Sequence, residues 1–221
     1  MKFLCYNKAN KQNLEDTPLQ NMDLTDIVFA VLGVAVIITM VIFMLEREKK
    51  LPRGRKKENA NAAVTVLKRF AANNSCRVLG PVTFAKGERT ARLDAVLVGW
   101  FGVLGIKSYG YNGQVYGNAG EDEWVWVSAD KREKFANPID ECTLAARLMR
   151  EALMNAGVRA PESEAVYVFT DPKLEMCIPR NLNPMNLSDL RSYLRKDKFQ
   201  KDRGYDLDVM CAALEPFVEQ K

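Results

Sequence analysis

The sequence predicts a single-pass membrane protein of the α/β class, with a mixed central sheet flanked by helices and preceded by one transmembrane helix. Two observations carry this prediction. Residues 27–45 form an uncharged apolar run, and the chain after it alternates short β-branched runs with segments of helical periodicity. The part after the linker holds about 160 residues, enough for one sizeable core. The expected parts are an external N-terminal segment (1–26), a transmembrane helix (27–45), a basic juxtamembrane linker (46–57), a domain (58–200) and a C-terminal helical extension (201–221).

The apolar run is long enough to span a bilayer. It holds 19 residues, and at 1.5 Å per residue it covers close to the roughly 30 Å hydrocarbon core. Thr39 carries the one hydroxyl of the run, and this hydroxyl can bond back to the helix's own backbone. A cleaved signal peptide fits poorly, because 26 polar-rich residues precede the run and no small-residue cleavage pattern follows it. We therefore expect a retained transmembrane helix rather than a buried core helix.

The flanks of this run set its orientation. Residues 46–58 carry three acidic residues and seven basic ones, namely Arg47, Lys49, Lys50, Arg53, Arg55, Lys56 and Lys57. By the positive-inside rule this flank and the domain after it face the cytoplasm, and the N-terminus lies outside the cell. The expected location is the cell membrane. Anionic lipid head groups are the expected partner of the basic linker, since each nearby Lys or Arg contributes about 1 kcal/mol of attraction.

Local signals place the elements of the domain in order. Pro138 begins one helix, and Gly157 follows its end. The other helices are expected over 59–74, from Ser188 or Asp189 to Arg195, and over 205–217. Strands are expected over 78–79, 82–84, 93–98, 103–109, 124–127, 165–170 and 174–178.

The best strand signal is a hairpin whose two apolar, β-branched runs flank the turn Gly99-Trp100-Phe101-Gly102. If Val98 faces Val103 across this turn, Asp94 lies directly opposite Lys107. Side chains opposite each other in such a pair lie about 4.5–5.5 Å apart at Cβ. The hairpin therefore predicts a cross-strand ion pair between Asp94 and Lys107.

Composition excludes several kinds of chemistry. The chain has no histidine, which rules out Ser-His-Asp and Cys-His catalysis, HNH-type nucleases and His-liganded zinc sites. Its cysteines form no C-x-x-C pair, and we expect small buried hydrophobes at Cys5, Cys76, Cys142, Cys177 and Cys211. Residues 59–221 hold 22 basic and 21 acidic residues, so DNA is a weak candidate partner. The basic run 195–203 is diluted by aspartates, and we interpret it as solvated surface.

An ordered series of motifs runs through the domain. Asp94 begins a strand, Gly102 closes the turn, and the glycine-rich stretch 111–117 follows; Trp124, Asn137-Pro138 and the strand 166–170 come after it. In this order and spacing the sequence resembles the NERD (nuclease-related) domain, a relative of the PD-(D/E)xK nucleases, over roughly residues 58–200. The resemblance implies a nuclease-like mixed central sheet flanked by helices.

The resemblance also implies a site at which an Asp and the Glu of an E-x-K motif hold a divalent cation. Here Lys107 falls on the family's Glu and Tyr109 on its Lys, while Ala60 falls where a helix begins with a Glu in the family and Glu58 lies nearby. An ammonium removes a metal ligand and puts positive charge where the metal would lie. We therefore expect a degenerate site made of Asp94, Lys107 and Tyr109, and no cofactor.

Three functions stay open. The first is a membrane-anchored binding or scaffolding module. The second is a nuclease that acts on DNA with Mg²⁺ or Mn²⁺, through Asp94 and a relocated carboxylate from Glu88, Glu121 or Glu123. The third is an interaction module for an unknown protein partner or for anionic lipid. Tyr109 and Tyr111 are expected to be half-buried strand aromatics rather than a platform for stacking bases.

Overall fold

The computed structural model describes residues 32–40 and 60–219. The chain divides into two units after Glu48. In the first unit, residues 32–40 form an exposed helix, in which the Thr39 hydroxyl donates to the carbonyls of Ala35 (3.0 Å) and Val36 (2.8 Å), as the sequence predicts. None of the helices among the described residues combines the length and the apolar character that crossing a membrane requires. The N-terminal segment 1–26, the rest of the apolar run and the basic linker 46–57 lie outside the described residues.

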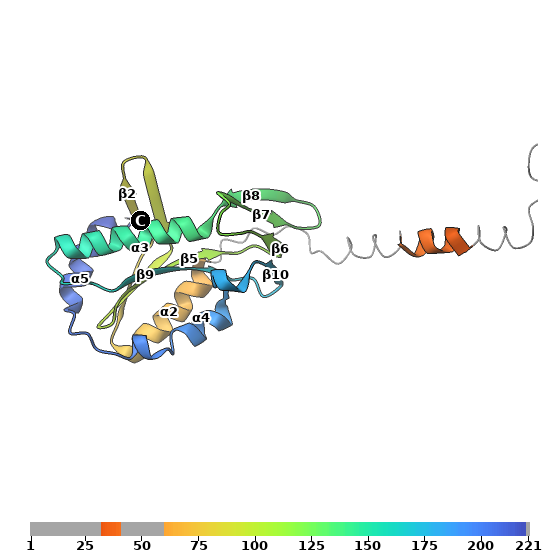
Figure 1. Cartoon of the computed structure of the whole chain (residues 1–221). Coiled ribbons are helices and arrows are strands. Elements are labelled where there is room, and N and C mark those ends of the chain that lie inside the picture. The colour runs from red at the N-terminus through yellow and green to blue at the C-terminus, as the bar shows by residue number, and fades with distance from the viewer. Residues whose placement is uncertain (1–31, 41–59, 220–221) are drawn as a thin grey trace, which may run out of the picture. The chain divides into compact units, whose positions relative to one another are not determined.

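The second unit is built on a five-stranded mixed sheet (Figure 1). In spatial order its strands are β1 (Arg77–Leu79), β4 (Ala95–Gly99), β5 (Gly102–Tyr109), β9 (Ser163–Phe169) and β11 (Met185–Asn186). Strand β4 is antiparallel to β1 and β5, whereas β9 is parallel to β5 and β11. This is the mixed sheet of the predicted α/β class.

Helices cover both faces of this sheet (Figure 1). Helices α2 (Ala60–Asn74) and α4 (Leu187–Tyr193) pack on one face, and α3 (Pro138–Asn155) and α5 (Leu207–Leu214) pack on the other. Because successive strand residues point to opposite faces, Leu97 of β4 joins the core under α2, while Val96 and Val98 join the core under α3. The central strands are therefore apolar on both sides, as the hairpin sequence predicts.

A smaller sheet and a hairpin extend from this body. The smaller sheet has the order β10 (Leu174–Cys177), β6 (Gly113–Tyr116), β7 (Glu123–Val127) and β8 (Arg132–Ala136). The hairpin joins β2 (Val82–Lys86) to β3 (Arg89–Leu93). Three short 3₁₀ turns complete the described elements: η1 (Arg180–Leu182), η2 (Asp197–Phe199) and η3 (Glu215–Phe217). The buried rings of Trp124 and Trp126 pack with Phe169 of β9 and so tie the smaller sheet to the main one.

Two predicted helix starts are wrong. Helix α4 is capped by Asn186 rather than by Ser188 or Asp189. The Asn186 side chain accepts hydrogen bonds from the backbone N–H groups of both residues, and the Asp189 carboxylate accepts one from the Asn186 N–H. This reciprocal arrangement is a capping box with Asn and Asp in the two positions. The C-terminal helix begins at Leu207, not at residue 205, because Asp206 is its N-cap.

Strand β3 has no counterpart among the predicted elements before residue 93. Ala91 and Leu93 are buried, whereas the other residues of the strand are exposed. One buried alanine and one buried leucine give only a weak alternating pattern of apolar and polar residues. Pairing with β2, from Val82 opposite Leu93 to Lys86 opposite Arg89, supplies the long-range partner that a local pattern does not show.

Candidate functional site

The predicted hairpin register is confirmed. Val98 faces Val103 and Ala95 faces Ile106 across the turn between β4 and β5. Before β4 begins, the chain bends at Asp94, whose backbone N–H still donates to the Ile106 carbonyl at 2.8 Å. Gly80 packs directly against this bend: a Cβ there would lie 2.8 Å from the Asp94 carbonyl oxygen, and its φ of +141° suits glycine. The backbone around Asp94 is thus fixed from two sides.

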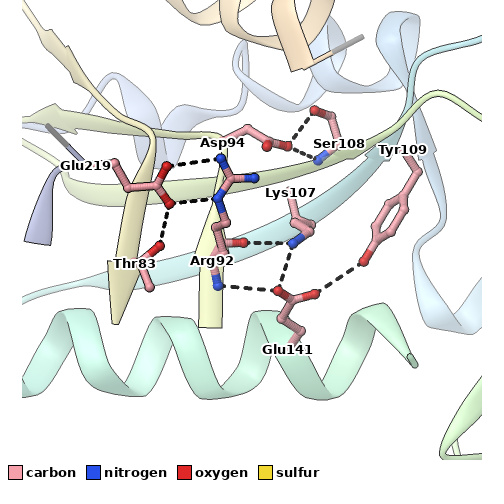
Figure 2. Close-up of polar contacts among 8 residues, drawn as sticks. All are labelled: Thr83, Arg92, Asp94, Lys107, Ser108, Tyr109, Glu141 and Glu219. Atoms are coloured by element: carbon pink, nitrogen blue, oxygen red, sulfur yellow. Dashed lines mark hydrogen bonds and ion pairs between the residues drawn. The ribbon is translucent and has the colours of Figure 1, made fainter. Parts of the chain in front are cut away.

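The predicted ion pair between Asp94 and Lys107 is wrong. One oxygen of the Asp94 carboxylate accepts hydrogen bonds from both the backbone N–H and the hydroxyl of Ser108, each at 2.6 Å (Figure 2). Ser108 follows Lys107 in β5, so their side chains point to opposite faces of the sheet. The bend at Asp94 turns its carboxylate to the Ser108 side, away from the ammonium that the regular register would place opposite it.

Lys107 is held instead by Glu141 of α3. Its ammonium lies 2.8 Å from the Glu141 carboxylate, and their side chains are 18% and 21% exposed. The ammonium also donates to the Arg92 carbonyl at 3.0 Å, and the backbone N–H of Arg92 donates to the same Glu141 oxygen at 3.3 Å (Figure 2). Lys107, Glu141 and the end of β3 thus form one mostly buried polar cluster.

Tyr109 lies at the edge of this cluster. Its hydroxyl donates a long hydrogen bond of 3.4 Å to the second Glu141 oxygen. Burial, and next the Glu141 charge, raise the pKa of Tyr109 well above its usual range, so the phenol stays neutral. Its ring packs against those of Tyr111, Phe135 and Phe169, with centroids 5.5–5.7 Å away. Tyr109 is therefore a half-buried strand aromatic, as predicted. The same prediction is wrong for Tyr111, which is buried and lies outside the named strands.

The polar network continues from Arg92 to the C-terminal end of the described chain. The Arg92 guanidinium donates to both Glu219 carboxylate oxygens, at 2.7 and 3.0 Å, and the Thr83 hydroxyl donates to one of them at 2.7 Å (Figure 2). The hydrogen bond from Arg92, and after it the one from Thr83, lower the pKa of Glu219 from 4.5 to about 2. Glu219 therefore stays ionised down to acidic pH.

The chemistry open to this arrangement is limited by pairing. Asp94 accepts from Ser108, and the charges of Lys107 and Glu141 compensate each other. Cys142 follows Glu141, but burial raises the pKa of its thiol to about 12, so it is a poor nucleophile. Over residues 32–40 and 60–219, no group of three or more His, Cys, Asp and Glu side chains is placed to hold a metal ion.

The carboxylates considered as relocated ligands lie elsewhere. Glu88 is exposed in the turn between β2 and β3, and the length of β3 separates it from Asp94 by about 20 Å. Glu121 accepts hydrogen bonds from Asn118, and Glu123 pairs with Lys134 at 3.0 Å within the smaller sheet. In the described structure none of the three joins Asp94.

Glu141 is the site residue that sequence reasoning missed. It lies in the first turn of α3, where acidic residues are common because they complement the helix dipole. That local explanation hides its long-range role. The one sequence signal for a role of Glu141 in the site is its position three residues after Pro138. This position lies in the first turn of α3, a helix that packs against β3 and β5. The resemblance implies that a helix begins at Ala60, and Ala60 is the first residue of α2. The basic linker lies outside the described residues.

The comparisons with known proteins identify one family. A family model described as NERD, nuclease-related domain, matches residues 53–170, which is just over half of the chain. No curated protein and no solved structure matches. The matched range contains Asp94, Lys107, Tyr109 and Glu141.

Proposed function

The chain belongs to the NERD, or nuclease-related domain, family, and from this membership we propose that it is a membrane-anchored protein whose nuclease site is degenerate. In this proposal the domain faces the cytoplasm and acts as a binding or scaffolding module. The single observation that carries the proposal is the place of Lys107. It occupies the strand position that the family pattern gives to a carboxylate, and its ammonium lies 2.8 Å from the Glu141 carboxylate of α3.

The physical argument concerns charge and ligand number. Mg²⁺ needs hard oxygen ligands in near-octahedral geometry, and a nuclease uses it to activate water and to stabilise the charged transition state. Lys107 removes one such ligand and adds a positive charge that repels the cation. The Glu141 carboxylate neutralises this ammonium, so it is not available as an unpaired ligand. Tyr109 occupies the position of the family's Lys, and because it is a neutral phenol, the positive charge of that Lys is absent from this position.

Membrane anchoring rests on the sequence. The apolar run 27–45, followed by seven basic residues in 46–58, supports one span with the domain on the cytoplasmic side. The helical residues 32–40 belong to this run. Membrane fractionation of cells that express the full chain tests this part. We expect the chain to resist extraction by high salt and by alkali, and to be released by detergent; release by salt alone would contradict the anchor.

Plasmid nicking by the full chain tests the loss of chemistry. We expect no cleavage above background with Mg²⁺ or Mn²⁺. Cleavage that needs the metal and disappears in Asp94→Ala would contradict the proposal. It would instead support the alternative function, a metal-dependent nuclease that acts on DNA through a rearranged site including Asp94.

A further inference from the structure

A basic hollow lies on the surface where α2 and α4 both end. Its volume is about 200 Å³, and three arginines line it: Arg69 from α2, Arg191 from α4 and Arg195 just after α4. No carboxylate is among the residues that line it. The hollow is separate from the polar cluster of Lys107 and Glu141, with which it shares no residue.

Helix geometry brings these arginines together. Arg191 lies in the last turn of α4, and Arg195, whose backbone N–H donates to the Ser192 carbonyl at 3.2 Å, follows in the turn after the helix, so both line the hollow. On α2 a spacing of four residues relates Arg69 to Asn73, whose side chain also lines the hollow. The floor is apolar: Val66 and Leu194 are buried, and the ring of Phe70 is half-buried. Three exposed arginines therefore line a hollow whose floor is apolar.

The charge of the hollow is uncompensated. Some cations of the described chain have carboxylate partners, such as Arg203 with Glu162 at 2.9 Å and Lys198 with Glu164 at 2.5 Å. Among the described residues Arg69, Arg191 and Arg195 form no ion pair. Helix C-termini favour nearby cations, but this interaction leaves their charge in place. In a domain that is nearly neutral overall, such local segregation of charge calls for an anionic ligand.

This finding refines the interpretation of the basic run 195–203 as solvated surface. The structure divides that run: Lys198 and Arg203 pair with glutamates of the neighbouring chain segment, whereas Arg195 turns to the hollow. Contiguity in sequence therefore gave the wrong grouping. The arginines that lie together come from two helices more than a hundred residues apart.

We propose that the hollow binds the phosphodiester backbone of a single-stranded nucleic acid. Guanidinium groups bind phosphate oxygens through two parallel hydrogen bonds, which a lysine cannot do. The exposed Asn73 amide adds a donor and an acceptor at the rim, and the Phe70 ring offers an apolar surface to a base beside the bound phosphate. Together these groups match a phosphate with an adjacent base better than a simple inorganic anion.

A lipid bilayer fits the hollow less well. A membrane surface is flat on the scale of this recess, so head groups must leave the plane of the bilayer to reach the floor. An extended strand carries its phosphates on a flexible backbone that enters a recess directly. The inference goes beyond the proposed function, because it concerns residues outside the strand site and holds whether or not cleavage survives there.

The test is fluorescence anisotropy with a labelled oligothymidylate of about 16 nucleotides and the full chain in phosphatidylcholine nanodiscs. The test variant is the triple change Arg69→Gln, Arg191→Gln and Arg195→Gln. The matched control removes the same charge elsewhere, through Arg147→Gln, Arg150→Gln and Arg159→Gln, three exposed arginines on and after α3. Each of the three single variants of the hollow is measured as well, and thermal melting checks that every variant is folded.

We expect salt-sensitive binding by the wild type and the control. For single strands, each phosphate contact contributes about 0.7 to the slope of log affinity against log salt concentration. The triple variant of the hollow should therefore lose about two units of this slope, and each single variant about 0.7. Equal loss in the triple variant of the hollow and in the control triple would overturn the proposal, as would a lack of oligothymidylate binding by the wild type. Vesicles containing phosphatidylserine form the last arm: variants of the hollow that lose vesicle binding alone would assign the hollow to lipid.

Discussion

The carboxylate of Glu141 lies 2.8 Å from the ammonium of Lys107, and a helix and a strand that are distant in sequence meet through this contact. Both side chains are about one-fifth exposed. The resemblance to the family pattern gives the strand position of Lys107 to a carboxylate. In the proposed function, the pair therefore places a positive charge, neutralised by the protein, where a metal-binding site would need a ligand.

Glu141→Gln should lower the free energy of unfolding by about 2 kcal/mol, because it leaves a mostly buried ammonium with a weaker, neutral partner. Glu123→Gln is the matched control. It breaks the exposed pair with Lys134, whose side chains are 68% and 53% exposed, and should change stability by less than about 0.5 kcal/mol. Urea denaturation of the full chain measures both. Equal effects of the two variants would show that the Lys107–Glu141 contact is not a stabilising one.

Asp94 should couple energetically to Ser108 and not to Lys107. In a double-mutant cycle, Asp94→Asn with Ser108→Ala should give a coupling energy of about 1 kcal/mol, since the Ser108 hydroxyl that the alanine removes donates to the Asp94 carboxylate. The parallel cycle with Lys107→Met should give a coupling close to zero. Unfolding free energies of the wild type and the five variants provide the test. A large coupling energy between Asp94 and Lys107 would contradict this prediction and would support the ion pair that the hairpin register alone predicts.

Glu219 should stabilise the fold at neutral pH and lose this effect in acid. Its pKa is lowered from 4.5 to about 2 by Arg92 and Thr83. A group with a lowered pKa contributes stability above its unfolded value, and this stability is lost as the pH falls from about 4.5 through about 2. The melting temperature of Glu219→Gln should therefore depend less on pH in that window than that of the wild type. Parallel curves for the two proteins would contradict the network of Figure 2.

Lys107→Glu should create a response to Mn²⁺ that the wild type lacks. The new carboxylate would lie beside Glu141, and two adjacent like charges destabilise the fold until a cation binds between them. Saturating Mn²⁺, at about 100 times the dissociation constant, would then stabilise the variant by about 2.7 kcal/mol. Thermal melting with and without Mn²⁺ measures this. Lys107→Gln is the control, because it removes the ammonium without adding a carboxylate, and an equal Mn²⁺ effect in both variants would refute the idea.

Local patterns were sufficient for much of the fold. The β-branched runs around Gly99 and Gly102 gave the hairpin and its register, and Pro138 marked the start of α3. The site depended on features that have no local signature. The bend at Asp94 arises where the chain packs on Gly80, and Glu141 reaches Lys107 from 34 residues away.

The same distinction explains the misplaced helix cap. Asn186 and Asp189 cap α4 reciprocally, but a serine and an aspartate within the next three residues offer equally plausible local caps. Which residue caps the helix is decided by where β11 ends, at Asn186, and β11 pairs with β9 through a long-range contact. In this chain, short-range chemistry predicts the elements, and tertiary pairing decides which polar side chains meet.

Isothermal titration of Mn²⁺ into the wild-type full chain, beside Asp94→Ala, tests the central claim most directly. If Lys107 and Glu141 neutralise each other in place of a metal, both proteins should give only heats of dilution. Saturable binding near one ion per chain in the wild type, lost in Asp94→Ala, would contradict the claim and establish a working metal site on Asp94.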